Sequence, residues 1–372
     1  MIRLARPDID DADVAAVTDV LRGGFLVQGP RVAEFERRVA ARAGADHGVA
    51  MANCTAALHL ALLALEVGPG DAVAVAAYSW PATANAVTLC GANAVFVDID
   101  PVTWNMDPRA LDDVLATQTH VKAIVPVHVF GGMADMIAIQ RIADKHGIPV
   151  VEDAACALGA VLDGRPAGSW GRIGCFSFHP RKSITTGEGG VLVTRDRAVA
   201  SQCRALRNHG LDPDAPQPDF IMPGYNLRLT EMQGALGLTQ LEKLDRILEH
   251  RRVVADWYGQ ALATLSVELP VESAPGAHTY QAYVVLLPQE LASRRTAIIA
   301  ALRAADVETT IGTHHQPLTR YYRERGSYKP GDFPVTDVVA ARALALPLHS
   351  AICHEDVTTV AERLAAALRT VT

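Results

Sequence analysis

Two side chains near the middle of the chain have the types and spacing of a reactive pair, the carboxylate of Asp153 and the amine of Lys182. Asp153 follows the apolar run "IPVVE", and Lys182 lies in "CFSFHPRKSITTGEGG". An acid at the end of a buried strand is costly unless it meets a cation or hydrogen-bond donors. A lysine in a desolvated pocket can react as a free amine. Two simpler interpretations stay open, in which Asp153 caps the next helix and Lys182 is an ordinary loop lysine.

The spacing of this pair is typical of pyridoxal-phosphate enzymes, in which an acid at a strand end precedes a lysine by about 30 residues. The carboxylate keeps the pyridine nitrogen protonated, and the lysine forms a Schiff base with the cofactor and then moves a proton. A cofactor phosphate needs hydroxyls and the N–H groups of a helix start, which Thr55 and Ser177 can supply. Trp80 can stack on the ring. Each of these three can equally be a cap, a strand residue or a packed aromatic.

These residues fall at the ends of apolar runs that alternate with helical patterns over the first 250 residues. Strands are expected at "HGVAMAN", "AVAVAAY", "NAVFVDID", "VKAIVPVHV" and "IPVVEDAA". Asp107-Pro108 predicts a helix start, and Gly147 predicts a helix end. Strands that are apolar throughout, each followed by a helix, indicate a mostly parallel sheet covered on both faces. Ligands bind at the carboxyl edge of such a sheet, where the chemical residues are predicted to meet.

The pattern changes after residue 170. "GCFSF" and "GGVLVT" predict two more strands, two helices are expected near 229–247 and 250–264, and "LDPDAPQPDF" is expected to be a mobile surface loop. "TYQAYVVLLP" predicts a strand and "ELASRRTAIIAALRAA" a helix. We therefore expect a large α/β domain over residues 12–250. Residues 251–372, together with residues 1–11, are expected to form a smaller α+β domain.

Composition excludes several classes of function. Hydrophobic residues make up 49% of the 372 and charged residues 20%, as in ordinary globular proteins. The net charge is −7 with no Lys/Arg block, which disfavours nucleic-acid binding. We see no signal peptide and no membrane span. The six cysteines are scattered without a CxxC pair, so we expect neither a metal site nor a disulfide framework, and we expect a cytoplasmic protein.

Together these residues resemble the DegT-type (DegT/DnrJ/StrS) nucleotide-sugar aminotransferases, which are pyridoxal-phosphate enzymes of fold type I. The resemblance covers nearly the whole chain. The motifs that carry it, in order, are "GFLVQGPRVAEFE", "CTAALHLALLAL", "AYSWPATANAV", "VFVDIDPVTWNMD", "VPVHVFG", "VEDAACALGA", "FSFHPRKSITTGEGG", "LRNHG", "GYNLRLTEMQGALGL" and "LALPLH". It implies an aspartate-aminotransferase-like α/β fold, with a mostly parallel seven-stranded sheet sandwiched by helices and a smaller C-terminal α+β domain.

The resemblance also implies roles for individual residues. Lys182 matches the Schiff-base lysine, Asp153 the partner of the pyridine nitrogen, and Trp80 the aromatic that stacks on the ring. The residues that match phosphate contacts are Cys54, Thr55, Ser177 and, from the partner subunit, Asn226. Because the family's active site lies at a dimer interface, a homodimer with shared active sites is implied.

Two positions depart from the family pattern, and three others match positions that contact substrate. Cys54 stands where glycine is usual, a change that a backbone N–H contact survives. Cys156 stands where Gln or His is common, next to the cofactor's ring oxygen, and a thiol donates only weakly. The residues at substrate-contacting positions are Phe25, His179 and His315, and for both histidines a cap or surface role stays open.

The resemblance implies transamination, because relatives that act as dehydratases have histidine where this chain has Lys182. "ITTGEGG" after the lysine resembles relatives that aminate sugar C-4. The expected reaction moves an amino group from L-glutamate to C-4 of a nucleotide-linked 4-keto-6-deoxyhexose, through an imine on Lys182. One alternative is a cyclitol (keto-inositol) aminotransferase. Another is a non-catalytic regulator that binds the cofactor, although the short stretch before the first motif leaves no room for a DNA-binding domain.

Overall fold

The computed structural model describes residues 1–274 and 276–371, and its centre is a sheet of short, buried strands. One block has the order β1-β10-β9-β6 and another the order β4-β2-β5. Parallel bridges from Ile124 to Val150 and from Val127 to Asp153 join β5 to β6, so the two blocks form one continuous sheet. The strands are β1 (His47–Met51), β2 (Ala72–Ala76), β4 (Asn93–Val97), β5 (Val121–Val125), β6 (Val151–Asp153), β9 (Ile173–Ser177) and β10 (Gly190–Thr194).

Most neighbouring strands of this sheet are parallel. β10 is the exception, because it runs antiparallel to both β1 and β9. The pairs β2–β4, β2–β5 and β6–β9 are parallel. All five residues of β2 are buried, as expected for a strand with helices on both faces. The α/β class predicted from the sequence is confirmed.

Helices cover the two faces of the sheet and form two separate apolar cores. One core contains side chains of α2, α5, α6 and the first half of α8, and the other contains side chains of α3, α4 and α7. Asp107 caps α5 and Gly147 ends α6 with a φ of 66°, as predicted. The helices of this part are α1 (Asp11–Gly23), α2 (Pro30–Arg42), α3 (Cys54–Ala64), α4 (Ala82–Leu89), α5 (Pro108–Thr117), α6 (Met136–His146) and α7 (Arg197–Arg207).

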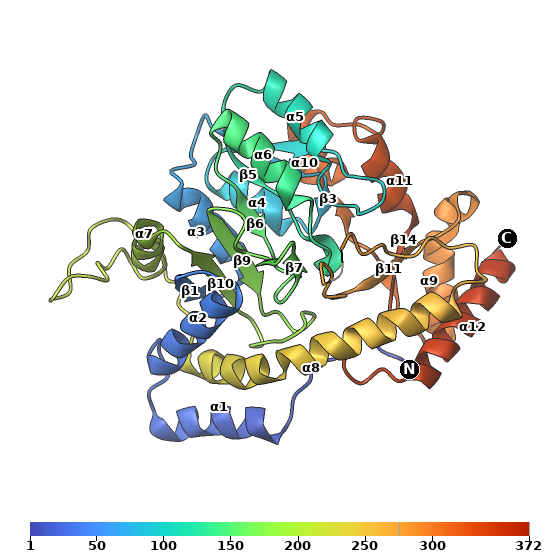
Figure 1. The fold of residues 1–372 in the computed structure, drawn as a ribbon, viewed down its shortest axis with the longest axis horizontal. Coiled ribbons are helices and arrows are strands. Elements are labelled where there is room, and N and C mark those ends of the chain that lie inside the picture. Colours follow the sequence, from blue (N-terminus) through green and yellow to red (C-terminus); the bar gives the residue numbers. More distant parts are fainter. Residues whose placement is uncertain (275, 372) are drawn as a thin grey trace.

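One long helix, α8 (Glu231–Ala261), runs beneath the sheet to the C-terminal helix α12 (His354–Val371) (Figure 1). The prediction of two helices near 229–247 and 250–264 is therefore wrong. The polar stretch around Arg251 does not break the helix, because this side chain is buried and Nη1 donates to the carbonyl oxygens of Tyr280 and Gln281.

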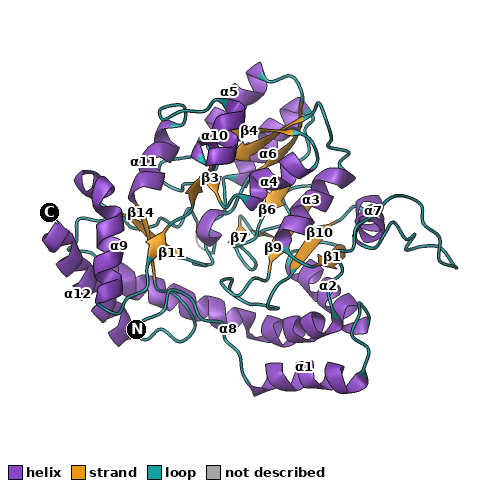
Figure 2. Ribbon diagram, turned by 180° about the vertical axis from the view of Figure 1, so that it is seen from behind, coloured by secondary structure: helices purple, strands orange, loops and turns teal. Residues whose placement is uncertain are grey.

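The C-terminal part has its own small sheet, in the order β11-β14-β12, packed against the end of α8. The N-terminal residues join it, since Ile2 bridges to Val307 and Leu348 N–H donates to the Leu4 carbonyl. They lie at the same end of the molecule as α12 (Figure 2). The elements here are β11 (Tyr283–Leu286), α9 (Arg295–Ala304), β12 (Thr310–Ile311), α10 (Arg320–Gly326), α11 (Pro334–Arg342) and β14 (Ala343–Leu346).

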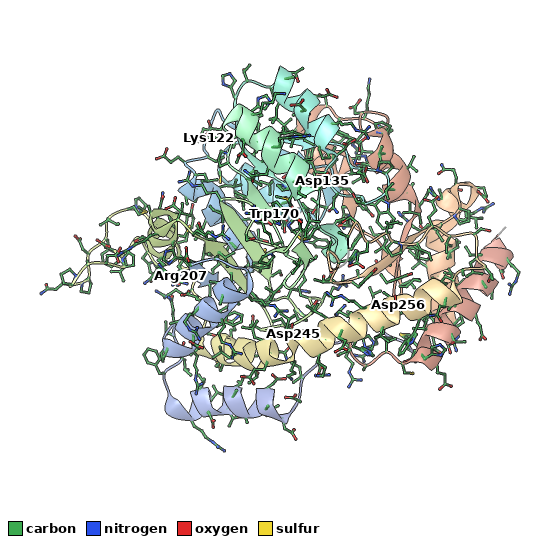
Figure 3. All side chains as sticks on the ribbon, in the orientation of Figure 1. Lys122, Asp135, Trp170, Arg207, Asp245 and Asp256 are labelled. Atoms are coloured by element: carbon green, nitrogen blue, oxygen red, sulfur yellow. The ribbon has the colours of Figure 1, made fainter. Side chains whose placement is uncertain are left out.

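Two short pairings and one ion pair complete the framework. β3 (Tyr78–Ser79) pairs with β13 (His314–His315), and β7 (Val161–Leu162) pairs with β8 (Arg165–Pro166). Arg207, labelled in Figure 3, lies at the end of α7. Its Nη1 donates to Glu36 of α2 and to the carbonyl of Ala50 in β1. The loop after α7, which includes residues 211–220, projects away from the body (Figure 1).

In the described part of the chain, no helix combines the length and the apolar composition that a membrane span needs.

Candidate active site

The structure brings Asp153 and Lys182 together at the carboxyl edge of the sheet. Asp153 is the last residue of β6, and Lys182 lies in the loop that connects β9 to β10. The two side chains interact electrostatically, and each also interacts with the thiol of Cys54 at the start of α3. Cys156 completes the group, because Lys182 Nζ lies 3.0 Å from its Sγ. Residues from one strand, one helix and two loops thus form one cluster.

The carboxylate of Asp153 is held in place by a chain of buried hydroxyls. Thr83 Oγ1 donates to Asp153 Oδ2 at 2.7 Å, and Ser79 Oγ lies 3.1 Å from Thr83 Oγ1. An ionised carboxylate only accepts, so Thr83 gives its proton to Asp153 and Ser79 can donate to Thr83. The second oxygen, Oδ1, accepts from the Ala155 N–H at 3.2 Å. The motif around Trp80 was noticed in the sequence, but the role of Thr83 was missed.

The neighbouring acid, Glu152, fixes the same strand end from the other face of the sheet. Its fully buried carboxylate accepts from the N–H groups of Gly168 at 2.8 Å and Gly171 at 2.7 Å, and from His128 Nε2 at 2.9 Å. His128 Nδ1 accepts from the Ala134 N–H, so the ring proton lies on Nε2. Sequence reasoning also missed Glu152, although an acid inside an apolar strand is itself a signal.

The start of α3 provides a cradle for an anion. Asn53 caps the helix by accepting from the Ala56 N–H at 2.9 Å, whereas the N–H groups of Cys54 and Thr55 have no partner within residues 1–274 and 276–371. Ser177, the last residue of β9, is half-buried and pairs with Gly190 at the start of β10. Free N–H groups at a helix N-terminus favour a phosphate.

Gly190 allows the strand and the helix to approach this closely. A Cβ at this position would lie 2.5 Å from the Cys54 nitrogen and 2.4 Å from the Asn53 carbonyl. Only glycine therefore lets β10 start directly against the first turn of α3. The cradle, the carboxylate and the amine fit the three needs of pyridoxal phosphate, which are an anion site, a partner for the ring nitrogen and a nucleophilic amine.

The free amine of Lys182 is held as an ammonium group. Burial lowers the pKa of Lys182, but the neighbouring Cys156, Cys54 and Asp153 raise it, and the net direction is upward. The idea that burial alone makes this amine neutral is therefore wrong for the cluster as it stands. The thiol of Cys156 contacts the lysine directly.

Trp80 and His315 lie beside this cluster on the segments joined by β3 and β13. Trp80 is 62% exposed, and its ring packs edge-on against His314 with 5.2 Å between centroids. His315 Nε2 bonds Asp337 Oδ1 at 2.8 Å, and within the described residues its buried Nδ1 has no partner. Burial lowers the pKa of His315 despite the nearby Asp337. One face of Trp80 is thus free to stack, while one nitrogen of His315 is already bonded.

Two predicted residues lie apart from the cluster within one chain. Phe25, which is 59% exposed, and Asn226 lie on the surface, where Asn226 is bridged to Asn208. His179 lies in the same loop as Lys182, and its Nδ1 accepts from the Arg181 N–H at 3.2 Å. In the part of the chain that the structure describes, no three His, Cys, Asp or Glu side chains are grouped to hold a metal ion.

The chain is similar to known proteins over nearly its whole length. A model of the DegT/DnrJ/EryC1/StrS aminotransferase family matches residues 7–365. The chain is 37% identical over 370 residues to the GDP-perosamine synthase of Caulobacter vibrioides. The aligned region covers 99% of this chain and 97% of the relative. The solved structure of TlmJ, an aminotransferase from Streptoalloteichus hindustanus, matches with a TM-score of 0.92 at 32% identity. The match covers 100% of this chain and 99% of the TlmJ chain.

A third relative carries information on the cofactor. Spr1654 from Streptococcus pneumoniae, assigned as a sugar aminotransferase, has been solved in a pyridoxamine-phosphate form and in a pyridoxal-phosphate form. The first of these has a TM-score of 0.95 at 28% identity and covers 100% of both chains. The chain described here therefore belongs to the DegT/DnrJ/EryC1/StrS aminotransferase family, as a sugar aminotransferase that depends on pyridoxal phosphate.

Proposed function

We propose that this protein transfers the amino group of L-glutamate to C-4 of a nucleotide-linked 4-keto-6-deoxyhexose. The observation that carries the proposal is the placement of Lys182 and Asp153 in one cluster at the start of α3. The relative in Caulobacter vibrioides, whose name gives a GDP-linked amino sugar as its product, supports a nucleotide sugar as the acceptor. A GDP-linked keto-sugar is therefore the first acceptor to assay.

Each part of the cluster has a task in this reaction. The N–H groups of Cys54 and Thr55 and the hydroxyl of Ser177 hold the cofactor phosphate at the start of α3. Asp153, oriented by Thr83, keeps a proton on the ring nitrogen. When bound, pyridoxal phosphate supplies the carbonyl that receives the amino group and a ring that accepts electrons.

Lys182 acts twice, both times through Nζ. It holds the cofactor covalently at rest, and once released it takes the proton that leaves the α-carbon of the donor. In the second half of the reaction the same nitrogen returns a proton to the sugar carbon that receives the amine. The loop between β9 and β10 keeps Nζ beside the cluster, since the Lys182 N–H donates to the His179 carbonyl at 2.8 Å.

Absorbance and turnover of the purified protein test the role of Lys182. With pyridoxal phosphate the protein is expected to absorb near the violet edge, and glutamate is expected to bleach that band. Lys182→Ala is expected to lose both the band and turnover. Lys145→Ala is a matched control, because this exposed lysine only pairs with Asp112 on the surface. Normal turnover by Lys182→Ala would show that another group does the chemistry.

The acceptor is tested by supplying GDP-, UDP- and dTDP-linked 4-keto-6-deoxyhexoses and a keto-inositol separately. Glutamate, glutamine and alanine are compared as donors. We expect glutamate with one of the nucleotide sugars to give the highest kcat/KM. Preference for the keto-inositol would contradict the proposed substrate while leaving transamination intact.

We also propose that the protein is a homodimer in which Asn226 of the partner subunit reaches the cofactor phosphate. The exposure of this side chain, and of apolar residues such as Phe25, Phe220 and Ile221, supports a covered face. Inactive Lys182→Ala and Asn226→Ala proteins, mixed and refolded together, are expected to regain activity, because one site of each mixed dimer is then intact. A mixture that stays inactive would contradict shared sites.

A further inference from the structure

The contact between Lys182 and Cys156 has a chemical consequence that transamination does not use. Lys182 Nζ and Cys156 Sγ are 3.0 Å apart, with no other atom of the chain between the amine and the thiol. A cysteine attacks an oxidant as its thiolate, and here Nζ is close enough to react with the oxidised sulfur. As whole residues, Cys156 and Lys182 are each partly exposed.

The other cysteines lack this combination of a neighbouring cation and access. Burial raises the pKa of the Cys90 and Cys203 thiols to about 12, and burial raises the pKa values of Cys54 and Cys175 as well. Cys353 is exposed, but its Sγ lies 3.2 Å from the carboxylate of Asp356 rather than beside an amine. Among the cysteines, Cys156 is therefore the one whose surroundings promote reaction.

We propose that Cys156 and Lys182 form a reversible sulfur–nitrogen cross-link when hydrogen peroxide reaches the site while the lysine amine is free. In the first step the thiolate sulfur attacks one peroxide oxygen, the O–O bond breaks, and the Lys182 ammonium gives a proton to the leaving hydroxide, so that a sulfenic acid, water and a neutral amine result. In the second step Nζ attacks the sulfur, an N–S bond forms, the S–O bond breaks, and the hydroxyl leaves as water with a proton from the nitrogen. Two thiols of an added reductant reverse the change. These two thiols become a disulfide, and the cysteine and the amine are restored.

The state of the cofactor controls this reaction. Nζ of Lys182 cannot attack the sulfur of Cys156 while it holds the cofactor. It can do so when the amino group has moved to the cofactor or when the site is empty. The cross-link itself requires only the observed contact, whereas this protection rests on the proposed role of Lys182. Oxidation is thus expected to block the cofactor-free and pyridoxamine-phosphate forms selectively.

Mass spectrometry of the cofactor-free chain treated with hydrogen peroxide tests the cross-link. We expect the intact mass to fall by two hydrogen atoms and the peptides containing residues 156 and 182 to be joined. Loading with pyridoxal phosphate, measured as violet-edge absorbance, is expected to fall in proportion to the joined fraction and to return after dithiothreitol. If Cys156 only gains oxygen atoms and no peptides are joined, the proposal is wrong.

Variants and cofactor states separate this proposal from the proposed function. Cys156→Ser is expected to form no joined peptide, and Cys353→Ser is a matched control expected to form it at the wild-type rate. A joined peptide in Cys156→Ser would contradict the proposal. If wild-type protein loaded with pyridoxal phosphate is cross-linked as fast as the cofactor-free chain, the cross-link stands, but the proposed role of Lys182 does not.

Discussion

Replacing Thr83 by valine removes the hydroxyl that orients the Asp153 carboxylate and leaves the shape of the side chain nearly unchanged. Thr83 is 1% exposed and Asp153 is 5% exposed, so water cannot easily replace the lost donor. A hydrogen bond to a charged group contributes about 1.5–3 kcal/mol, and an orphaned buried group costs a similar amount. We therefore expect Thr83→Val to lower the free energy of unfolding of the cofactor-free protein by about 1.5–3 kcal/mol.

Denaturant unfolding of the cofactor-free protein measures this change. Thr88→Val is a matched control in the same helix, because Thr88 Oγ1 makes only neutral bonds, to the Ala84 carbonyl at 3.3 Å and to the Tyr322 hydroxyl at 3.2 Å. We expect the control to cost no more than about 1 kcal/mol. Titration with pyridoxal phosphate provides a second measurement, in which Thr83→Val is expected to bind the cofactor more weakly than Thr88→Val.

A double-mutant cycle decides whether the cost arises at the carboxylate. In an Asp153→Ala background the hydroxyl has lost its acceptor, so adding Thr83→Val is expected to cost less than about 1 kcal/mol. If the full cost persists in that background, Thr83 stabilises the protein through another contact, and the reasoning is refuted.

Three further changes test other parts of the structure. Gly190→Ala is expected to weaken pyridoxal-phosphate binding at least about tenfold, because its Cβ would displace the Cys54 nitrogen; unchanged affinity in a titration would contradict the cradle. Glu231→Ala removes the acceptor of three N–H groups at the start of α2. Urea unfolding is expected to show a free energy of unfolding that is lower by about 2–4 kcal/mol. Burial raises the pKa of Asp13, but its hydrogen bonds with Lys243 and other groups lower the pKa by more, so the net shift is downward. The Asp13–Lys243 pair therefore stabilises the fold above about pH 4 and loses this effect as the pH falls further. Lys243→Met is therefore expected to lower Tm at pH 7, and its difference from wild type is expected to shrink below about pH 4; a constant difference would contradict the assignment.

The alternation of strands and helices could be predicted because buried parallel strands are apolar along their whole length. The run at Ala72–Ala76 is an example, since all five of its residues are buried and the strand lies between β4 and β5. The break expected near residue 250 was wrong, because the chain continues there as one helix. Arg251 Nη1 donates to carbonyl groups about 30 residues further along the chain, a contact that local sequence does not contain.

The same limit applies to the site. Asp153 and Lys182 could be proposed because a strand end and an unusual loop mark them in the sequence. The hydroxyl of Thr83 is 70 residues from Asp153, and its contact depends on which strands are neighbours in the sheet. The contact of Cys156 with Lys182 depends in addition on the course of two loops. The bond between His315 and Asp337 likewise joins segments that no periodicity relates.

The length of α8 limits how the molecule can move. At 1.5 Å per residue, its 31 residues make a rod about 46 Å long. Leu244 and Leu248 anchor one half in the core beneath the sheet, and Val254 and Tyr258 anchor the other half in the C-terminal core. Because no proline interrupts the rod, a hinge motion of one core against the other would have to bend a continuous helix. A swing of the two halves about this helix is therefore an unfavourable way to open or close the cluster at the carboxyl edge of the sheet.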